Sequence, residues 1–137
     1  MDNSIDINEL VYLHNQSREE GSWMWELKPL LMNQKLMDYA QEWAEHMASR
    51  NRMYHSSMRD IMRLGFSTAG ENIAWGQKDA ETVMKTWLNS PGHRANIMSS
   101  KYSDIGCGVA MSSKNRPYWC TCFGVPTDGQ IGIYGPC

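Results

Sequence analysis

Residues 87–94 read Trp87-Leu88-Asn89-Ser90-Pro91-Gly92-His93-Arg94, and within this stretch one helix ends and another begins. Ser90 is a favoured helix N-cap and Pro91 suits the first helical position, so we expect a short helix over about residues 93–98. The helix before this junction is expected to begin after Asp79, which can cap it, and to end at Leu88. The junction therefore predicts two separate helices.

Two longer helices are predicted in the first half of the chain. Asp6 followed by Glu9 resembles a capping box, and apolar residues then recur at helical spacing over about residues 7–20. Asn33 can cap a second helix over about residues 34–52, which has the clearest amphipathic stripe in the chain. That stripe consists of Leu36, Ala40, Trp43 and Met47, widened by Met37 and Ala44. The segment between the two helices is expected to be a loop.

The last third of the chain changes to strand-like patterning. Residues 105–111 and 118–123 are short runs with β-type residues, separated by a polar stretch, and predict an antiparallel hairpin. Residues 125–137 are expected to form a surface tail. Because there is no internal repeat, low-complexity tract or linker, we expect a single domain over residues 1–137.

Composition excludes several classes of protein. The 137 residues carry a net charge of -2, with 42% hydrophobic and 20% charged residues, so the chain has the profile of a globular protein and not of a disordered one. A strongly basic nucleic-acid binder is not expected. No apolar run reaches the ~18 residues that a membrane-spanning helix needs. No export leader opens the chain, although one could have been removed.

The four cysteines, Cys107, Cys120, Cys122 and Cys137, all lie in the last third of the chain. Their spacing does not match a redox CxxC or a zinc knuckle, so an even number in one region predicts two disulfides and an oxidising compartment. The predicted hairpin places Cys107 opposite Cys122 or Cys120, and Cys137 would take the remaining partner. The choice stays open, with Cys107–Cys122 and Cys120–Cys137 as the working pairing.

Two histidines and two acids occur where a core pattern does not require them: His55, Glu71, Glu81 and His93. Neutral imidazoles and carboxylates are suitable ligands or orienting groups for one divalent metal ion. Each residue also has a simpler interpretation. Glu81 suits the first turn of a helix, His93 and Glu71 suit exposed positions, and His55 can satisfy carbonyls at a helix end. Spacing alone does not show that the four residues meet.

A set of motifs, in order along the chain, resembles the CAP superfamily of cysteine-rich secretory, antigen-five and pathogenesis-related proteins, also called SCP-like domains. The set covers about residues 7–124. It consists of His14-Asn15-Gln16-Ser17-Arg18, Tyr54-His55-Ser56, Gly70-Glu71-Asn72-Ile73-Ala74-Trp75, residues 87–94 with Asn96-Ile97-Met98, Tyr102-Ser103-Asp104-Ile105-Gly106, Tyr118-Trp119 and Phe123-Gly124. The sequence Arg94-Ala95-Asn96 after Gly92-His93 is similar to the microbial SCP-like branch. We expect Asn15 and Arg18 to be structural.

The resemblance implies an α+β fold, an α-β-α sandwich with a small antiparallel sheet between helices. It also implies a cleft in which His55 and His93 can hold Zn²⁺ while Glu71 and Glu81 line the site. The family resemblance supports an extracellular, monomeric binding module for a lipid, a sterol or a protein partner. Nucleic acid is not an expected partner.

Two other functions remain open at this stage. A metal-assisted, peptidase-like hydrolase would use Glu71 or Glu81 as a general base beside a zinc-bound water. A metal-free variant would use Ser56 as a nucleophile. Against both, the chain has no HExxH helix and no nucleophile elbow. A passive extracellular scaffold is the remaining alternative.

Overall fold

The helix caps predicted from the sequence begin the two long helices. In the computed structural model, which describes residues 5–22 and 26–127, Asp6 accepts a hydrogen bond from the amide of Asn8 and begins α1 (Ile7–Gly21). Asn33 accepts hydrogen bonds from two amides in the first turn of α2 (Gln34–Arg50). Asn51 ends α2 in the left-handed conformation, with a φ of 50°, as an Asn residue tolerates.

The junction at residues 87–94 separates α4 (Ala80–Leu88) from α5 (Pro91–Ile97). Asp79 accepts a hydrogen bond of 2.8 Å from the amide of Thr82, which satisfies one free donor at the start of α4. Ser90 occupies the N-cap position of α5, and Pro91 takes the first helical position. The predicted order of helices is confirmed, and α5 begins two residues earlier than expected.

Four strands form one sheet in the order β1-β3-β4-β2. The predicted hairpin is confirmed as β3 (Asp104–Met111) and β4 (Pro117–Pro126), which pair antiparallel. β2 (Phe66–Trp75) pairs antiparallel with the other side of β4, and β1 (Leu31–Met32) is a short parallel partner of β3. β2 therefore forms one edge of the sheet, and this position matters for the site.

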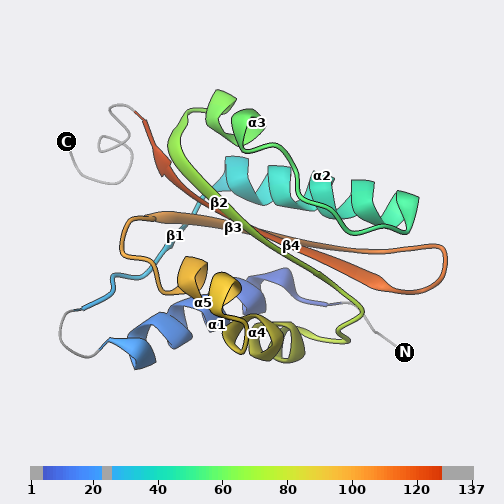
Figure 1. Cartoon of the computed structure of the whole chain (residues 1–137), viewed down its shortest axis with the longest axis horizontal. Coiled ribbons are helices and arrows are strands. Elements are labelled where there is room, and N and C mark those ends of the chain that lie inside the picture. Colours follow the sequence, from blue (N-terminus) through green and yellow to red (C-terminus); the bar gives the residue numbers. More distant parts are fainter. Residues whose placement is uncertain (1–4, 23–25, 128–137) are drawn as a thin grey trace.

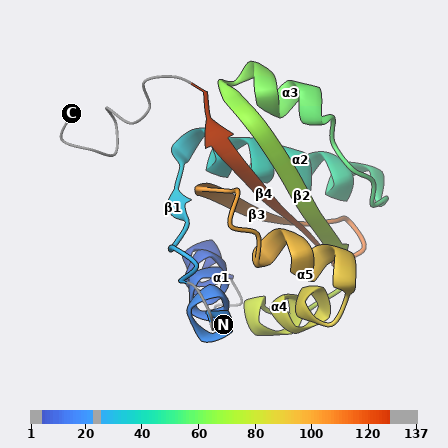
Figure 2. The same ribbon diagram turned by 60° about the vertical axis from the view of Figure 1, so that its left-hand side comes forward.

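The helices cover both faces of this sheet. Figure 1 shows α2 and α3 (Met58–Arg63) on one face, and α1, α4 and α5 on the other; Figure 2 shows the same layers from a second direction. Two groups of buried side chains fill the two layers, one on each side of β3 and β4. The expected α-β-α sandwich is confirmed, with a parallel pair added at the β1 edge of the antiparallel sheet.

Close contact between α2 and β3 requires glycine. A Cβ atom at Gly106 would overlap the backbone of Leu36 and Met37, and one at Gly108 would overlap the backbone of Gln41. The helix therefore lies directly on the strand at these two points, because no side chain separates them.

Three features differ from the sequence prediction. β2 was not predicted, and Glu71 was considered suited to an exposed position, whereas β2 is a ten-residue strand whose residues 70–74 are all buried. β1 lies in the expected loop, and α3 was not predicted. β4 extends to Pro126, so residues 125 and 126 belong to a strand, and residues 128–137 of the expected tail lie outside the described residues. None of the helices in the described part of the chain has the length and apolar character needed to cross a bilayer.

Candidate functional site

Glu71 is a buried acid at the centre of the edge strand β2. Its side chain is only 1% exposed. Its Oε1 atom accepts a hydrogen bond of 2.8 Å from Nδ1 of His55 and one of 2.9 Å from the amide of Ser56. Its Oε2 atom accepts a 2.5 Å hydrogen bond from the hydroxyl of Ser56. The carboxylate therefore fixes the segment between α2 and α3 against the sheet.

His55 is hydrogen-bonded through one ring nitrogen, and most of its side chain is exposed to solvent. The side chain is 61% exposed, although Nδ1 is bound to the buried Glu71 carboxylate. Because a carboxylate only accepts, Nδ1 carries the proton, and Nε2 is the ring nitrogen that remains as a ligand atom. This arrangement of carboxylate, imidazole and open nitrogen is typical of histidines that bind metal ions.

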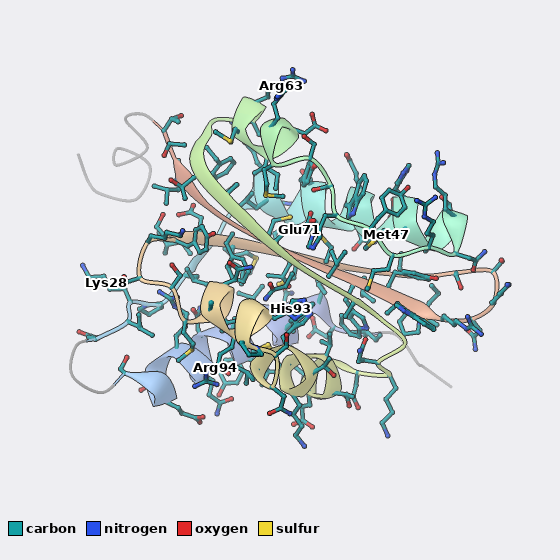
Figure 3. The ribbon with its side chains drawn as sticks, viewed as in Figure 1. Lys28, Met47, Arg63, Glu71, His93 and Arg94 are labelled. Atoms are coloured by element: carbon teal, nitrogen blue, oxygen red, sulfur yellow. The ribbon has the colours of Figure 1, made fainter. Side chains whose placement is uncertain are left out.

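His93 approaches the same edge of the sheet from the opposite face. It lies in the first turn of α5, and its Nδ1 is 2.9 Å from the hydroxyl of Ser90. Partial burial, and then the positive charge of His55, lower the pKa of His93 below its usual value. The second cause indicates that the two imidazoles lie close enough to interact electrostatically, although they come from different layers. Figure 3 shows Glu71 on β2 and His93 on α5.

Asn72 connects the edge strand to α5. It is completely buried, and its amide nitrogen donates to the carbonyl of His93 at 3.1 Å. Its Oδ1 accepts a hydrogen bond of 2.9 Å from Asn96. Since successive residues of a strand point to opposite faces, Glu71 holds His55 on one face while Asn72 holds α5 on the other. The two histidines therefore flank the β2 edge.

Glu81 takes no part in the hydrogen bonds described for the other three candidates. It is exposed in the first turn of α4, next to the Asp79 cap. Among the described residues, no hydrogen bond or ion pair joins Glu81 to His55, Glu71 or His93. The structure thus brings His55 and Glu71 into contact, places His93 within electrostatic reach, and leaves Glu81 as a free surface acid.

A tighter group of metal-ligand atoms lies beneath His55. Within residues 5–22 and 26–127, Glu71, Cys120 and Cys122 form the one set of three His, Cys, Asp or Glu residues whose ligand atoms all lie within 4.8 Å of one another. The Cys120 and Cys122 sulfurs are 3.7 Å apart, and they lie 3.7 and 4.0 Å from Glu71 Oε2. The sequence prediction assigned these cysteines to disulfides and so missed their contact with Glu71.

The working pairing Cys107–Cys122 is wrong in this structure. Cys107, Cys120 and Cys122 are free thiols. The hairpin register pairs Cys107 with Thr121, so Cys107 faces the opposite side of the sheet from its expected partners. The thiol of Cys107 instead accepts a hydrogen bond from Thr121, and burial raises its pKa to about 12. Cys137, and with it the Cys120–Cys137 pairing, lies outside the described residues.

Four polar residues hold the two histidines or their elements through hydrogen bonds: Ser56, Ser90, Asn72 and Asn96. The sequence analysis considered Ser56 only as a nucleophile and Ser90 only as a helix cap. For Asn72 and Asn96, their place in the motifs quoted above was the only sequence signal. The expectation that Asn15 and Arg18 are structural agrees with their contacts: Asn15 pairs with both backbone groups of Leu30, and Arg18 binds three carbonyl oxygens.

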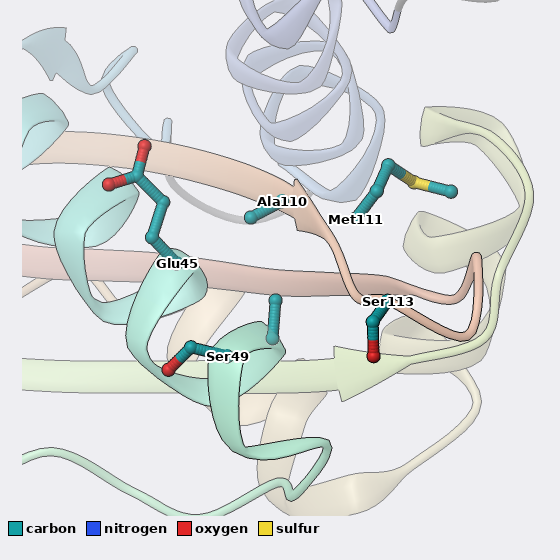
Figure 4. Close-up of a pocket in the computed structure, with 6 residues that line it drawn as sticks. Glu45, Ser49, Ala110, Met111 and Ser113 are labelled. Carbon is teal, nitrogen blue, oxygen red and sulfur yellow. The ribbon is translucent and has the colours of Figure 1, made fainter.

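Two pockets in the described residues lie away from His55 and His93. One of about 200 Å³ is formed by the end of α2 and the end of β3, where Glu45, Ser49, Met111 and Ser113 line it (Figure 4). A more apolar one of about 590 Å³ lies beside Lys28, Leu31 and Tyr102. Neither is lined by a candidate ligand histidine. We refer to the His55–His93 region, in which the His55 side chain is 61% exposed, as the surface site.

The α-β-α sandwich, together with a buried Glu71 that holds an exposed His55, defines an SCP-like domain. Residues 11–123 match the CAP family, described as the cysteine-rich secretory protein family, and the chain belongs to this family. The Bacillus subtilis protein YkwD is 37% identical over 112 residues, which make up 76% of this chain and 42% of YkwD. The chain thus spans about two-fifths of that relative.

Solved structures share the fold. An extracellular protein containing a SCP domain from Bacillus anthracis has a TM-score of 0.73 and 26% identity, over 87% of this chain and 40% of that one. An outer surface protein from Borrelia burgdorferi has a TM-score of 0.75 and 22% identity, over 93% and 100% of the two chains. NaASP2, solved with Zn²⁺, has a TM-score of 0.68 and 16% identity, over 93% and 87%. The bacterial matches agree with the microbial branch that the sequence indicated.

Proposed function

We propose that this chain is an extracellular CAP domain that holds a divalent cation, with Zn²⁺ as the first candidate, between His55 and His93 and binds a lipid, a sterol or a protein partner there. The observation that carries the proposal is the 2.8 Å hydrogen bond from His55 Nδ1 to the buried Glu71 carboxylate. An export route is supported by the relatives, since one solved neighbour is described as extracellular and another as an outer surface protein.

The residues present are suitable for such an ion. Both imidazoles have their Nδ1 atoms engaged, His55 by Glu71 and His93 by Ser90, so each ring is oriented and has Nε2 left as a ligand atom. Two nitrogen ligands are a common part of zinc sites. When bound, the cation would supply positive charge that attracts an oxygen ligand from a partner. Glu81, exposed on α4, is the remaining acid that could contact such a partner.

Metal binding at these rings requires their neutral form. The lowered pKa of His93 keeps that ring neutral further into the acidic range than a free histidine, whose pKa is ~6.5. Because a protonated imidazole cannot bind metal, we expect zinc affinity to fall as the pH drops below ~6.5. Calorimetric titrations at pH 8 and pH 5 check this, and equal affinities at both would exclude the imidazoles as ligands.

The hydrolase alternative has less support from the geometry. Both oxygens of Glu71 already accept hydrogen bonds from His55 and Ser56, so this carboxylate is a poor candidate for a general base. The hydroxyl of Ser56 donates to Glu71, and Ser56 is only 8% exposed, so it is not positioned as a nucleophile. We therefore expect zinc-loaded protein to bind without hydrolysing peptides.

Isothermal titration with Zn²⁺ tests the site directly. His55→Ala and His93→Ala should each reduce the affinity of the surface site by more than tenfold, and Glu71→Gln should reduce it 10–100-fold through loss of ring orientation. His46→Ala is the matched control, because His46 stacks on Trp43 at a centroid distance of 4.7 Å and belongs to no candidate metal site. Unchanged zinc binding in His55→Ala and His93→Ala would overturn the proposal.

A further inference from the structure

Directly beneath the His55 side chain, two thiols and a carboxylate oxygen converge on one point. Cys120 and Cys122 lie two residues apart on β4 and therefore point to the same face of the sheet. The register places Cys122 directly opposite Glu71 on β2, with Cys120 opposite Ile73. Sheet pairing alone thus brings the three side chains together, without any contribution from a flexible loop.

We infer that Cys120, Cys122 and Glu71 form a second, buried site for a thiophilic metal ion such as Zn²⁺. This inner site uses other ligand atoms than the His55–His93 site, although Glu71 belongs to both. Soft thiolate ligands select ions of this kind, and a carboxylate oxygen is an accepted third ligand.

The distances fit a tetrahedral ion. With Zn–S bonds of about 2.3 Å and tetrahedral angles, two ligating sulfurs would be about 3.8 Å apart, and a sulfur and a carboxylate oxygen would be about 3.6 Å apart. The structure has 3.7 Å between the sulfurs, and 3.7 and 4.0 Å from the sulfurs to Glu71 Oε2. The three atoms therefore need to move by only a few tenths of an ångström.

A disulfide between the same two cysteines is a poorer fit. Two residues along a strand separate the Cα atoms by about 6.8 Å, at the upper limit for a disulfide, and the side chains stand parallel on one face. A metal ion can bridge 3.7 Å between the sulfurs without moving the backbone, whereas an S–S bond of about 2.05 Å cannot form without distorting it.

The carboxylate of Glu71 can serve both sites because its two oxygens have different neighbours. Oε1 binds His55 and the amide of Ser56, while Oε2 contacts the hydroxyl of Ser56 and the two thiols. An ion on Oε2 would leave the orientation of His55 intact. It would enter beside the exposed His55 ring, since the segment that covers Glu71 forms no helix or strand between residues 52 and 57.

Binding at the inner site has a defined proton balance. Burial, the hydrogen bond with Cys122 and the charge of Glu71 raise the pKa of Cys120 well above its usual value, so this thiol is protonated without metal. A divalent ion displaces the proton from each coordinated thiol, so each ion bound by Cys120 and Cys122 releases up to two protons. No oxidant or reductant takes part in this exchange.

Co²⁺ added to the full reduced chain is a suitable probe, because thiolate ligands give cobalt an intense near-ultraviolet charge-transfer absorption that imidazole ligands do not. We expect this absorption in the wild type, its displacement by Zn²⁺, and its loss in Cys120→Ser/Cys122→Ser. Cys107→Ser is the matched control, since Cys107 is equally buried but faces the other side of the sheet. It should retain the absorption.

A His55→Ala/His93→Ala variant separates this proposal from the proposed function, because it should lose the surface site and keep the thiolate absorption. If the double cysteine variant does not fold by circular dichroism, Cys122→Ala alone should weaken Co²⁺ binding at least tenfold. No thiolate absorption in the wild type, or absorption that survives loss of both cysteines, would overturn the inner site.

Discussion

The carboxylate of Glu71 combines nearly complete burial with three hydrogen bonds from the adjacent His55-Ser56 pair. In Glu71→Gln, the charged acceptor becomes a neutral amide, so the hydrogen bonds from His55 and Ser56 lose their charge assistance and one oxygen is replaced by a donor. Hydrogen bonds to a charged group contribute about 1.5–3 kcal/mol, and we expect the free energy of unfolding to fall by about 2 kcal/mol.

Urea unfolding of metal-free protein measures this effect. His55→Ala removes one partner of the same carboxylate from a largely exposed position and should cost less than about 1 kcal/mol, because exposed pairs contribute little. If Glu71→Gln and His55→Ala had equal effects, the buried hydrogen bonds of Ser56 would not be the main stabilising contacts.

His14 makes the stability of the fold depend on pH. It is completely buried between Trp87 and Phe123, its Nδ1 bonds to the carbonyl of Leu10, and Nε2 has no partner in the described residues. Burial is the main cause that lowers the pKa of His14 to about 4. In the unfolded chain the pKa is ~6.5, so between these values the unfolded state binds the proton and the native state does not.

The free energy of unfolding therefore decreases as the pH falls from ~6.5 towards 4. At pH ~4.5, His14 alone lowers it by about 2.5 kcal/mol relative to neutral pH. We expect His14→Phe, which cannot titrate, to lose correspondingly less stability than the wild type between pH 7.5 and pH 4.5. Urea unfolding at the two pH values checks the difference. An identical loss in both proteins would mean that other groups carry the acid sensitivity.

Among the elements, the packing of α2 on β3 depends on two glycines. In Gly106→Ala, the added Cβ would overlap the backbone of Leu36 and Met37, which cannot move aside as a flexible side chain could. We expect α2 to be pushed from the sheet at a cost of about 1–3 kcal/mol, the usual range for overpacking. Thermal and urea unfolding measure this cost.

Gly92→Ala is the control for that substitution. Gly92 is exposed in the first turn of α5, and an added Cβ meets nothing within 4 Å. Alanine is the better helix former, so Gly92→Ala should be neutral or stabilising by up to about 1 kcal/mol. Equal destabilisation by both variants would indicate a general cost of replacing glycine and not a packing effect.

The accuracy of the sequence prediction differed between elements for physical reasons. α1 and α2 carried caps and an apolar stripe, and α4 carried a cap; all of these are local signals. β2 was missed because residues 70–74 are buried on both faces, so the strand lacks the alternation that identifies a half-exposed strand. The hairpin was predicted correctly, but a register change of one residue moved Cys107 to the other face of the sheet.

The candidate site was harder to predict from short stretches of sequence than the fold was. His55 and Glu71 are 16 residues apart, and only the pairing of β2 with β4 and the path of the α2–α3 segment bring them together. Ordered family motifs supplied that information, whereas spacing did not. The Glu71–Cys120–Cys122 group was missed for the same reason, since it depends on a β2–β4 register that no motif encodes.

Across the whole molecule, Arg18 joins three parts of the chain. Its guanidinium is buried, with Nη1 donating at 2.8 Å to the carbonyls of Ile97 and Ser99 and Nε donating at 2.9 Å to the carbonyl of Lys28. It therefore ties α1 to the end of α5, the helix that carries His93, and to the segment that leads into β1. The donors of a guanidinium are spread over a planar fork that reaches these separate carbonyls, whereas the three donors of a lysine ammonium all lie on one nitrogen.

We expect Arg18→Lys to lower the free energy of unfolding by about 2–3 kcal/mol, since buried carbonyls lose charge-assisted hydrogen bonds while the positive charge is kept. Arg50→Lys is the matched control on the exposed last turn of α2 and should change stability by less than about 0.5 kcal/mol. Urea unfolding compares the two variants.

Because α5 carries His93, Arg18→Lys should also weaken zinc binding at the surface site. It should leave the Co²⁺–thiolate absorption of the inner site unchanged. A variant that kept full stability would show that the carbonyls find other partners and that α1 and α5 are joined mainly by apolar packing.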